Sequence, residues 1–585
     1  MYSANSKKLL EARYLRRTSE GVINETPEGL FNRVATSISK SEYKYGGKTA
    51  VDHWHQVFYQ MMVKLYFLPN SPTLMNAGLK KGQLSACFVL PVEDNTNAIF
   101  DTLHLAALIQ RSGGGTGFNF SKIRPAGSLV TNSGLIASGP VGFMGLFDKM
   151  TDQIKQAGKR RGANMAILNI DHPDIEQFIT SKSWNGELSN FNLSIGITDE
   201  FMHAVVSNNT WTLRHPANTQ TKEISARLLW GQISENAWNT GDPGVLFLDA
   251  IERANPTPIL GKITATNPCG EMPLLDYESC NLGSINLSKM IIQNSKKPAV
   301  DWLLLENTIM HAVRFLDDVI DANHYPKKIL GQMARANRKI GLGVMGWAEM
   351  LIKLQIPYAS AEAVELGRKI MSFIDKIGKQ TSEDLAILKG SFPNWGKSIY
   401  FPDHPLRNAT ITSIAPTGGI SIIANTSSSI EPLYGLAYEH HVLDGESLSE
   451  ANEHVMQFID KYKLDNGDLK KHILDYGSVA SVKKIDKRVK KLFMVANEIP
   501  FKYHLLHQQI FQKHTDNAVS KTINLPENST QDKIAEIFMQ AWKMGLKGIT
   551  VYRDGSKSDQ VLQHSGSKIH KRKIVLEGCK ICQLS

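Results

Sequence analysis

Apolar positions favour helices through the first 65 residues of the chain, beginning with Leu9 and Leu10. This pattern predicts a helical N-terminal region over residues 1–65. Two prolines then interrupt the helical pattern, and residues 84–92 have the apolar, β-favouring composition of a strand. Residues 99–112 are apolar on most faces, which predicts a helix buried inside the protein rather than lying on its surface.

From residue 167 onward, short strand candidates alternate with amphipathic helices. Residues 363–389 predict a long helix that ends at a glycine. A strand at 520–525 is followed by a helix capped by Ser529, and a further strand is predicted at 549–552. This alternation predicts an α/β fold with a parallel or largely parallel core, either closed or doubly wound.

Composition places the chain among ordinary globular proteins, because 42% of its 585 residues are hydrophobic and 21% are charged. The net charge of +10 suits an enzyme of anionic small molecules as well as a nucleic-acid binder. The N-terminus has no apolar signal core, and no apolar run reaches bilayer length. We therefore expect a cytoplasmic enzyme that does not bind a membrane. The five cysteines are too few for a disulfide scaffold, so each must be assessed separately.

The segment Asn267-Pro-Cys269-Gly-Glu271 places an amide, a thiol and a carboxylate at alternate positions. If the segment is extended, the three side chains share one side. The intervening proline and glycine favour a loop or tight turn. A thiol beside an acid/base group and a hydrogen-bonding amide indicates a catalytic constellation.

Residues 556–585 show no periodicity and predict a flexible tail. The tail carries Cys579 and Cys582, two residues apart. They could form half of a zinc site, completed by His564 and His570. Alternatively, they form a dithiol on a mobile arm that carries reducing power into a buried site. The second interpretation requires a disulfide in the body of the protein, for which Cys87 and Cys280 are the candidates.

Three glycine-containing segments are candidate phosphate or nucleotide sites. Residues 341–346 match the G-x-G-x-x-G fingerprint, but a charged segment precedes them instead of a strand, so we expect packing glycines in an apolar turn or helix. Residues 416–421 are rich in small residues and could bind phosphate through backbone N–H groups, or form a plain turn. Residues 159–162 form a basic loop that could hold a phosphate or be solvated. No P-loop pattern is present, which argues against nucleoside triphosphate hydrolysis.

Taken together, these segments resemble the ribonucleotide reductases. The matching segments, in the order of the family, are SPTLMNAG (71–78), SACFVLPV (85–92), SGGGTGFNFSKIRPAGS (112–128), NPCGE (267–271), ESCNLGSINL (278–287), IGLGVMG (340–346), PTGGIS (416–421) and HTDNAVSKTINLP (514–526). The resemblance implies a ten-stranded α/β barrel, in which two antiparallel halves of five parallel strands surround a central finger loop that carries NPCGE. We expect three parts: helical residues 1–65, the catalytic barrel over 66–555, and the flexible tail over 556–585.

The resemblance also implies a role for each candidate catalytic residue. Cys269 would become a thiyl radical that abstracts the 3′ hydrogen of the substrate, Glu271 would take the 3′-hydroxyl proton, and Asn267 would hydrogen-bond the ribose hydroxyls. Cys87 and Cys280 would reduce the 2′ position and become a disulfide.

The tail pair Cys579 and Cys582 would reduce that disulfide and be recharged by a thioredoxin-type reductant. By the same resemblance, the contacts to a ribonucleoside diphosphate substrate would be Ser71, Ala86, Cys87, Gly115, Asn267, Pro268, Cys269, Gly270, Glu271, Pro416, Thr417, Gly418, Gly419 and Ile420. The loop that responds to a deoxynucleoside triphosphate effector would be Lys159, Arg160, Arg161, Gly162 and Ala163. The resemblance implies a homodimer, no metal-ligand cluster and no nucleic-acid partner.

The oxygen-dependent class of the family has two adjacent tyrosines near its last strand, whereas this chain has only Tyr552 there. That difference resembles the class II enzymes, which use adenosylcobalamin as cofactor. The alternatives are a large subunit that needs a separate radical-generating subunit, and a non-catalytic nucleotide sensor with the same fold. Too few residues precede the barrel for the ATP-binding cone of many relatives, so we expect no global inhibition by dATP.

Overall fold

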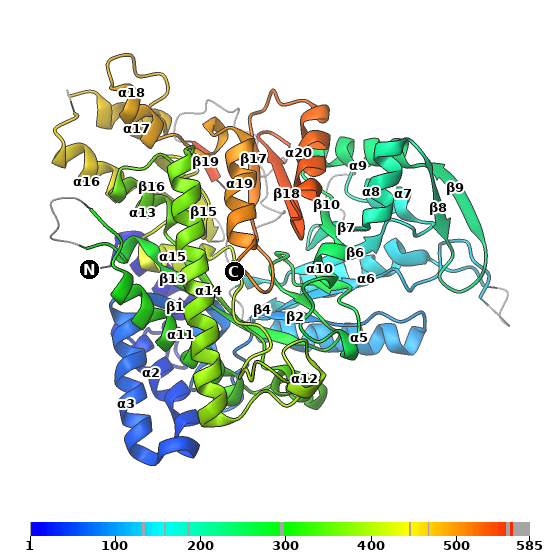
Figure 1. The fold of residues 1–585 in the computed structure, drawn as a ribbon, viewed down its shortest axis with the longest axis horizontal. Coiled ribbons are helices and arrows are strands. Elements are labelled where there is room, and N and C mark those ends of the chain that lie inside the picture. The colour runs from blue at the N-terminus through cyan, green and yellow to red at the C-terminus, as the bar shows by residue number, and fades with distance from the viewer. Residues whose placement is uncertain are drawn as a thin grey trace.

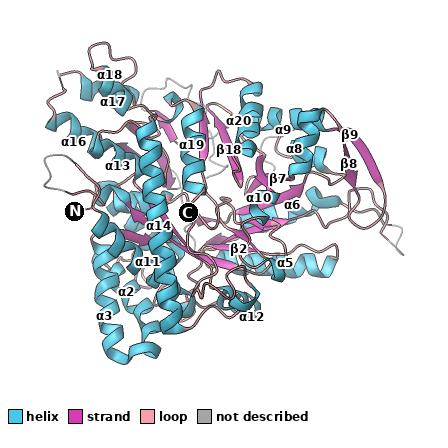
Figure 2. Cartoon of the chain, viewed as in Figure 1, coloured by secondary structure: helices cyan, strands magenta, loops and turns pink. Residues whose placement is uncertain are grey.

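The computed structural model describes residues 2–130, 135–156, 160–183, 188–292, 298–443, 446–465, 467–556 and 562–564 (Figures 1 and 2). Lys159, Cys579 and Cys582 lie outside the described residues. No helix in the described ranges combines the length and apolar character needed to cross a membrane.

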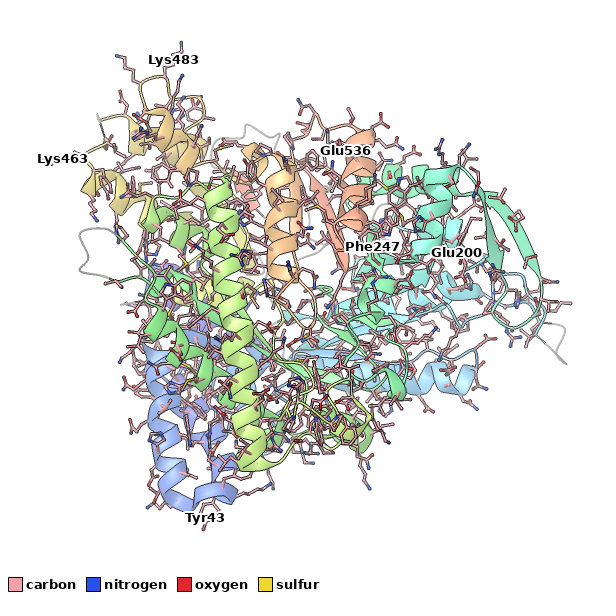
Figure 3. The ribbon with its side chains drawn as sticks, viewed as in Figure 1. Tyr43, Glu200, Phe247, Lys463, Lys483 and Glu536 are labelled. Carbon is pink, nitrogen blue, oxygen red and sulfur yellow. The ribbon has the colours of Figure 1, made fainter. Side chains whose placement is uncertain are left out.

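The N-terminal region is helical, as the sequence predicts. Its elements are α1 (Ala4–Leu9), a π-helical turn η1 (Leu10–Tyr14), α2 (Pro27–Ser39) and α3 (Tyr43–Val63). Thr26 caps α2 by accepting a hydrogen bond from the Gly29 N–H at 3.1 Å, and Pro27 occupies the first turn, where its missing N–H has no cost. Figure 3 places Tyr43 at the outer end of these helices, and α2 and α3 pack on α11 (Trp302–Ala322).

One half of a barrel consists of five parallel strands. In spatial order these are β2 (Cys87–Val89), β3 (Gly115–Asn119), β6 (Asn164–Asn169), β7 (Phe191–Ile197) and β10 (Gly244–Phe247). The helices of this half are α5 (Thr96–Arg111), α6 (Gly139–Gln153), α7 (Ile175–Thr180), α8 (Asp199–Ser207), α9 (Ala226–Thr240) and α10 (Leu248–Glu252). A β8–β9 hairpin (Thr210–Arg214, Thr221–Ser225) and a short β4–β5 pair (Lys155–Gln156, Arg160–Arg161) lie outside the barrel sheet.

The second half also runs parallel, from β13 (Ser279–Asn286) through β14 (Ile340–Met345) to β17 (Thr522–Leu525) and β18 (Gly548–Arg553). Residues 410–414 complete it, because they form parallel bridges from Thr412 to β14 and from Ile414 to Val519. β13 pairs antiparallel with β2, and β18 pairs antiparallel with β10. These two seams close the sheet and confirm the predicted ten-stranded barrel of two antiparallel halves.

Further helices cover the second half and its neighbouring layers (Figure 1). They are α12 (Lys328–Asn337), α13 (Trp347–Leu354), α14 (Ala361–Lys389), α15 (Gly418–Ala424), α16 (Glu453–Lys461), α17 (Leu469–Tyr476), α18 (Lys487–Leu492), α19 (Phe501–Gln512) and α20 (Gln531–Lys543). The prediction for 363–389 is confirmed, and Gly390 follows α14 with a positive φ of 84°.

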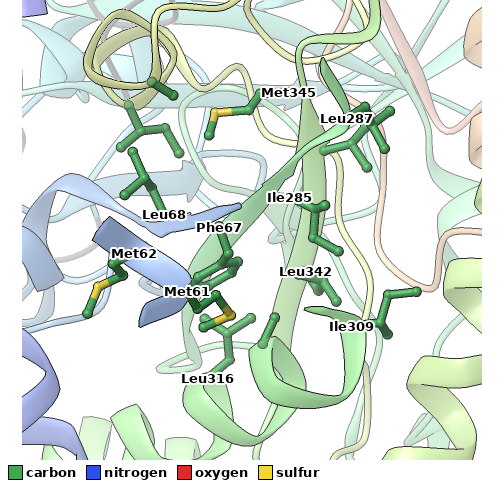
Figure 4. Packing of buried hydrophobic residues seen from close by; sticks show 14 of the residues in the cluster. Met61, Met62, Phe67, Leu68, Ile285, Leu287, Ile309, Leu316, Leu342 and Met345 are labelled. Atoms are coloured by element: carbon green, nitrogen blue, oxygen red, sulfur yellow. The ribbon is translucent and has the colours of Figure 1, made fainter. Parts of the chain in front are cut away.

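The strand that begins the barrel is interrupted by an excursion. β1 (Phe67–Pro69) pairs with residues 283–285 of β13, and β2 pairs with residues 279–280 of the same strand. Between them the chain leaves to form α4 (Ser71–Asn76) and returns at Ala86. Figure 4 shows Phe67, Leu68 and Ile285 among the buried apolar side chains around β1 and β13. The excursion starts and ends next to the centre of β13, so Ser71 and Ala86 both lie near this part of the strand.

Two expectations about apolar segments are wrong. Residues 341–346 lie in β14 and at its end, instead of in a turn or helix. Glycine is needed there because a Cβ at Gly343 would lie 2.3 Å from the carbonyl oxygen of Ser413 on the neighbouring strand. α5 is not buried on all sides, since Phe100 remains 49% exposed. Apolar residues on most faces of a helix therefore do not by themselves show that all of its faces are buried.

Two differences concern the end of the chain. The N-cap of α20 is Thr530, one residue later than predicted, and its hydroxyl accepts from Lys533 N–H. Leu562–His564 forms a short strand, β19, on β15 (Ala437–Leu443), which itself pairs with β16 (Glu446–Ala451). Regular structure therefore occurs in three residues of a segment for which the sequence predicts none.

Candidate active site

A finger loop, residues 265–274, carries the candidate catalytic residues. Its stem is an antiparallel pair of β11 (Ala265–Thr266) and β12 (Pro273–Leu274). At the tip, Gly270 N–H donates to the Asn267 carbonyl at 3.1 Å, and Gly270 has a φ of +80° that favours glycine. The tip is therefore the tight turn that proline and glycine predict, and not an extended segment.

Both halves of the barrel hold the finger loop in place. Asn192 in β7 donates to the Pro268 carbonyl at 2.8 Å, and Ser413 donates to the Glu271 carbonyl at 2.9 Å. On β3, a Cβ at Gly117 would lie 1.7 Å from the carbonyl oxygen of Thr266, so only glycine allows the loop to approach. The sequence analysis missed these supporting residues. Gly117 belongs to a glycine-rich stretch that is visible in the sequence, whereas Asn192 and Ser413 have no local signal.

Cys87 and Cys280 occupy directly opposite positions where β2 meets β13. Opposite residues of an antiparallel pair have Cα atoms about 4.5–5.5 Å apart, within the range of about 4.4–6.8 Å that a disulfide requires. Both are thiols in this structure. The Asn267 amide donates to the Cys87 sulfur at 3.1 Å, and the Cys87 sulfur lies 3.9 Å from the Glu271 Oε1 atom. Side-chain contacts thereby join Asn267, Cys87 and Glu271, and Cys280 lies opposite Cys87 in the strand pair.

Burial controls the protonation of this network. Glu271 is completely buried, and burial raises its pKa from 4.5 to about 7. Its Oε2 atom has no hydrogen-bond partner among the described residues. Burial also raises the pKa of Cys87 and of Cys280 well above the ordinary thiol value. Near neutral pH the site therefore holds two protonated thiols beside a carboxyl group that is poised to gain or lose a proton.

A pocket of about 600 Å³ lies over the fingertip. Its lining includes these residues of the predicted substrate site: Ser71, Ala86, Cys87, Gly115, Asn267, Pro268, Cys269, Glu271, Thr417 and Ile420. It also includes residues that the sequence analysis did not name: Asn70, Pro72, Gly113, Leu282, Gly283, Ser284 and Ala415. Five of these residues lie inside motifs that match the family, and Asn70 and Ala415 each directly precede one.

A larger cavity, with about 2150 Å³ of empty space including adjoining solvent, also reaches the fingertip. Pro268 and Cys269 belong to both linings, so the half-buried Cys269 lies at the junction of the two spaces. Gly270 and Pro416 line the larger cavity and not the smaller pocket. Gly418 and Gly419 lie in the first turn of α15 and line neither space.

The predicted effector loop is only partly placed. Ala163 lines the smaller pocket, and Gly162 packs where a Cβ would lie 2.5 Å from the Gln110 side-chain oxygen. The backbone of Arg160–Arg161 forms β5.

Comparison with known proteins agrees with this geometry. The family model of the ribonucleotide reductase barrel domain matches residues 85–402 and 400–552, and that of the ribonucleotide reductase all-alpha domain matches residues 1–82. A solved structure titled "Actinobacillus ureae class Id ribonucleotide reductase alpha subunit" has the same fold, with a TM-score of 0.77. The match covers 94% of this chain and 97% of that chain, at 23% identity.

Two relatives are named vitamin B12-dependent ribonucleoside-diphosphate reductase. The relative from Thermoplasma acidophilum is 46% identical over 95% of this chain and 80% of its own length. The relative from Mycobacterium tuberculosis (strain H37Rv) is 45% identical over 96% of this chain and 79% of its own length. Both family models match, and both relatives match over nearly the whole of this chain. The chain therefore belongs to the ribonucleotide reductase family.

Proposed function

We propose that this protein reduces ribonucleoside diphosphates to 2′-deoxyribonucleotides by a thiyl-radical mechanism, with adenosylcobalamin as cofactor. The names of the two relatives support both the diphosphate substrate and the cofactor. The observation that carries the proposal is the position of Cys269 at the junction of two cavities. A radical generated in one space can then act, through this thiol, on a substrate in the other.

The larger cavity fits a corrin cofactor. It opens onto Cys269, and its lining is more extensive than that of the smaller pocket and mixes polar with apolar side chains. Residues of β17, of β18 and of the segment 425–434 would hold the cofactor. When bound, adenosylcobalamin supplies a carbon-centred radical by homolysis of its cobalt–carbon bond.

Cys269 would abstract the hydrogen atom from the 3′ carbon of the ribose. A thiyl radical exchanges hydrogen with such a C–H bond at little energetic cost, provided that water and stray thiols are excluded. Glu271 would accept the 3′-hydroxyl proton, for which a pKa of about 7 is suitable near neutral pH. Asn267 would orient the ribose hydroxyls while its amide contacts Cys87.

The opposite thiols would then supply the reducing equivalents. The C2′–O bond breaks and the oxygen leaves as water. Cys87 and Cys280 together give up two protons and two electrons and form a disulfide, and Cys269 returns its hydrogen to the 3′ carbon. Their raised pKa values support this role, because a thiol that stays protonated can donate hydrogen. Exchange with the dithiol of Cys579 and Cys582 would restore both thiols, and a thioredoxin-type protein would reduce the tail.

We infer further that the protein forms a homodimer through α5 and α6. These helices pack together and leave the apolar side chains of Phe100 and Leu146 49% and 42% exposed. A deoxynucleoside triphosphate effector would act through residues 159–163, which lead into β6 beside the smaller pocket.

The decisive test is reduction of CDP by the purified chain with dithiothreitol, with and without adenosylcobalamin. We expect deoxycytidine diphosphate only when adenosylcobalamin is present, and none from the Cys269→Ala variant. Turnover that is independent of adenosylcobalamin, or that requires a second radical-generating subunit, would overturn the cofactor assignment. Full activity of Cys269→Ala would overturn the mechanism.

A further inference from the structure

A buried ion pair in the wall of the larger cavity has no role in the chemistry above. Lys521, which precedes β17, has a completely buried side chain whose ammonium group contacts the carboxylate of Glu431. The second carboxylate oxygen of Glu431 accepts from the Thr522 N–H at 2.8 Å. The Glu431 side chain remains 24% exposed, and both residues line the larger cavity.

Fold stability does not explain this pair. Taking two charges out of water costs about as much as their attraction returns, so apolar residues of similar size often serve as well. Neutral rings surround the lysine: its Nζ atom lies 6.0 Å from the centre of the Tyr358 ring, and burial lowers the pKa of His504 and of His507, with the Lys521 charge adding to the effect. The pair therefore requires an explanation other than stability.

The pair holds one end of a segment, residues 425–431, that contacts Thr417 in the lining of the smaller pocket. Two residues before Glu431, the Ser429 N–H donates to the Thr417 hydroxyl at 2.7 Å. Thr417 lines the smaller pocket with a φ of +59°, an unfavourable conformation for a β-branched residue. Ser429 also has a positive φ, of 50°. Such conformations persist only where the surrounding contacts enforce them.

Other contacts also hold the segment, and near its end the Tyr358 hydroxyl donates to the Ile430 carbonyl at 2.8 Å. Glu349 accepts from the Ser427 N–H at 2.8 Å, and the Ser428 hydroxyl lies 3.1 Å from that of Ser421. Glu431 is the member of the segment that contacts β17 through a charged group. Contacts therefore connect the two spaces. Lys521 in the larger cavity contacts Glu431, and Ser429, two residues before Glu431, contacts Thr417 in the smaller pocket.

We propose that the Glu431–Lys521 pair is a positioning pair that couples occupancy of the larger cavity to nucleotide binding in the smaller pocket. A ligand that fills the larger cavity displaces water from the exposed part of Glu431. Exclusion of water strengthens the ion pair, because the attraction between charges increases as the local dielectric constant falls. The tightened pair restrains segment 425–431 and holds Thr417 in its nucleotide-binding conformation.

This inference rests on the proposed function, since it identifies the two ligands as a corrin and a nucleoside diphosphate. Coupling between two binding sites is reciprocal: if the corrin tightens nucleotide binding, the nucleotide must tighten corrin binding by the same factor. Couplings of this kind usually change affinity by about 5–150-fold. If the pair were purely structural, its removal would lower the stability of the protein without changing this coupling factor.

The test is calorimetric titration of full-length protein with CDP, with and without saturating adenosylcobalamin in the dark. The Cys269→Ala background prevents turnover, so binding is measured at equilibrium. We expect adenosylcobalamin to tighten CDP binding at least fivefold with the native pair. With Glu431→Gln and Lys521→Met combined, the factor should fall to about one. This double variant leaves no buried charge unpaired, so it should fold even if a single variant does not.

Two controls separate coupling from stability. Lys521→Arg keeps the charge and should retain more of the coupling than Lys521→Met. Glu25→Gln combined with Arg33→Met removes a similarly buried ion pair, 10% and 9% exposed, whose residues line neither cavity, and should leave the factor unchanged. Native coupling in the double variant, or no coupling in the parent, would overturn this proposal. Failure of the parent to bind CDP or adenosylcobalamin at all would instead overturn the proposed function.

Discussion

Replacement of Glu271 by glutamine should have opposite effects on activity and stability. Glutamine has nearly the same shape and can still contact Cys87, but it cannot accept a proton. Loss of the proposed general base should therefore abolish detectable turnover. The same change removes a carboxyl group that is completely buried and has one oxygen without a hydrogen-bond partner among the described residues. The variant should therefore be more stable than the parent at alkaline pH.

The magnitude follows from the pKa of Glu271, which burial raises from 4.5 to about 7. Because the folded-state pKa lies above the unfolded value, the associated stability is fully present below pH 4.5 and is lost as the pH rises to about 7. At about 1.4 kcal/mol per pKa unit, the loss is roughly 3 kcal/mol. The stability advantage of Glu271→Gln should grow between pH 4.5 and pH 7 and remain constant above pH 7.

Equilibrium urea unfolding of parent and variant at pH 5, 6, 7 and 8 measures this difference. Infrared spectroscopy should also show a protonated carboxyl band in the parent that titrates near pH 7 and is missing in the variant. Glu278→Gln is the matched control, because that buried carboxylate is paired with buried Lys339 and its loss should destabilise the protein at every pH. A stability difference for Glu271→Gln that does not change with pH would refute the reasoning.

Three further predictions concern the tail, the finger loop and a buried charge cluster. Cys579→Ser and Cys582→Ser should retain turnover driven by dithiothreitol and lose turnover driven by thioredoxin; loss of both activities would contradict the tail's role. Gly117→Ala should displace the finger loop, because its Cβ would lie 1.7 Å from a loop carbonyl oxygen, and turnover should fall by about 100-fold. Its control, Gly231→Ala in α9, has open space around the new Cβ and should stabilise the protein by roughly 0.5–1 kcal/mol in thermal unfolding. Asp317→Ala should cost about 3–5 kcal/mol in urea unfolding, because it removes the completely buried carboxylate that pairs with both Arg338 and Arg407; a loss below 1 kcal/mol would contradict this.

Local sequence patterns were sufficient to predict those elements whose formation depends on neighbouring residues. A helix such as α14 requires only an apolar face, a capping serine and a terminal glycine, and all of these are visible in the sequence. The motif at 267–271 could likewise be identified as a turn that carries a thiol and a carboxylate. Cysteine spacing further indicated a redox function, since a tail dithiol has a use only if the body holds a disulfide.

The sequence by itself therefore determined several of the helices and strands, the turn that carries Cys269 and, through resemblance, the family. Tertiary structure decided what depends on residues far apart in the chain. It paired Cys87 with Cys280 across a strand seam and buried Glu271 enough to raise its pKa to about 7. It also made residues 341–346 part of a strand region, because close packing against Ser413, and not local propensity, is the reason for those glycines. Burial and strand register are properties of the closed barrel, and no short segment of sequence contains them.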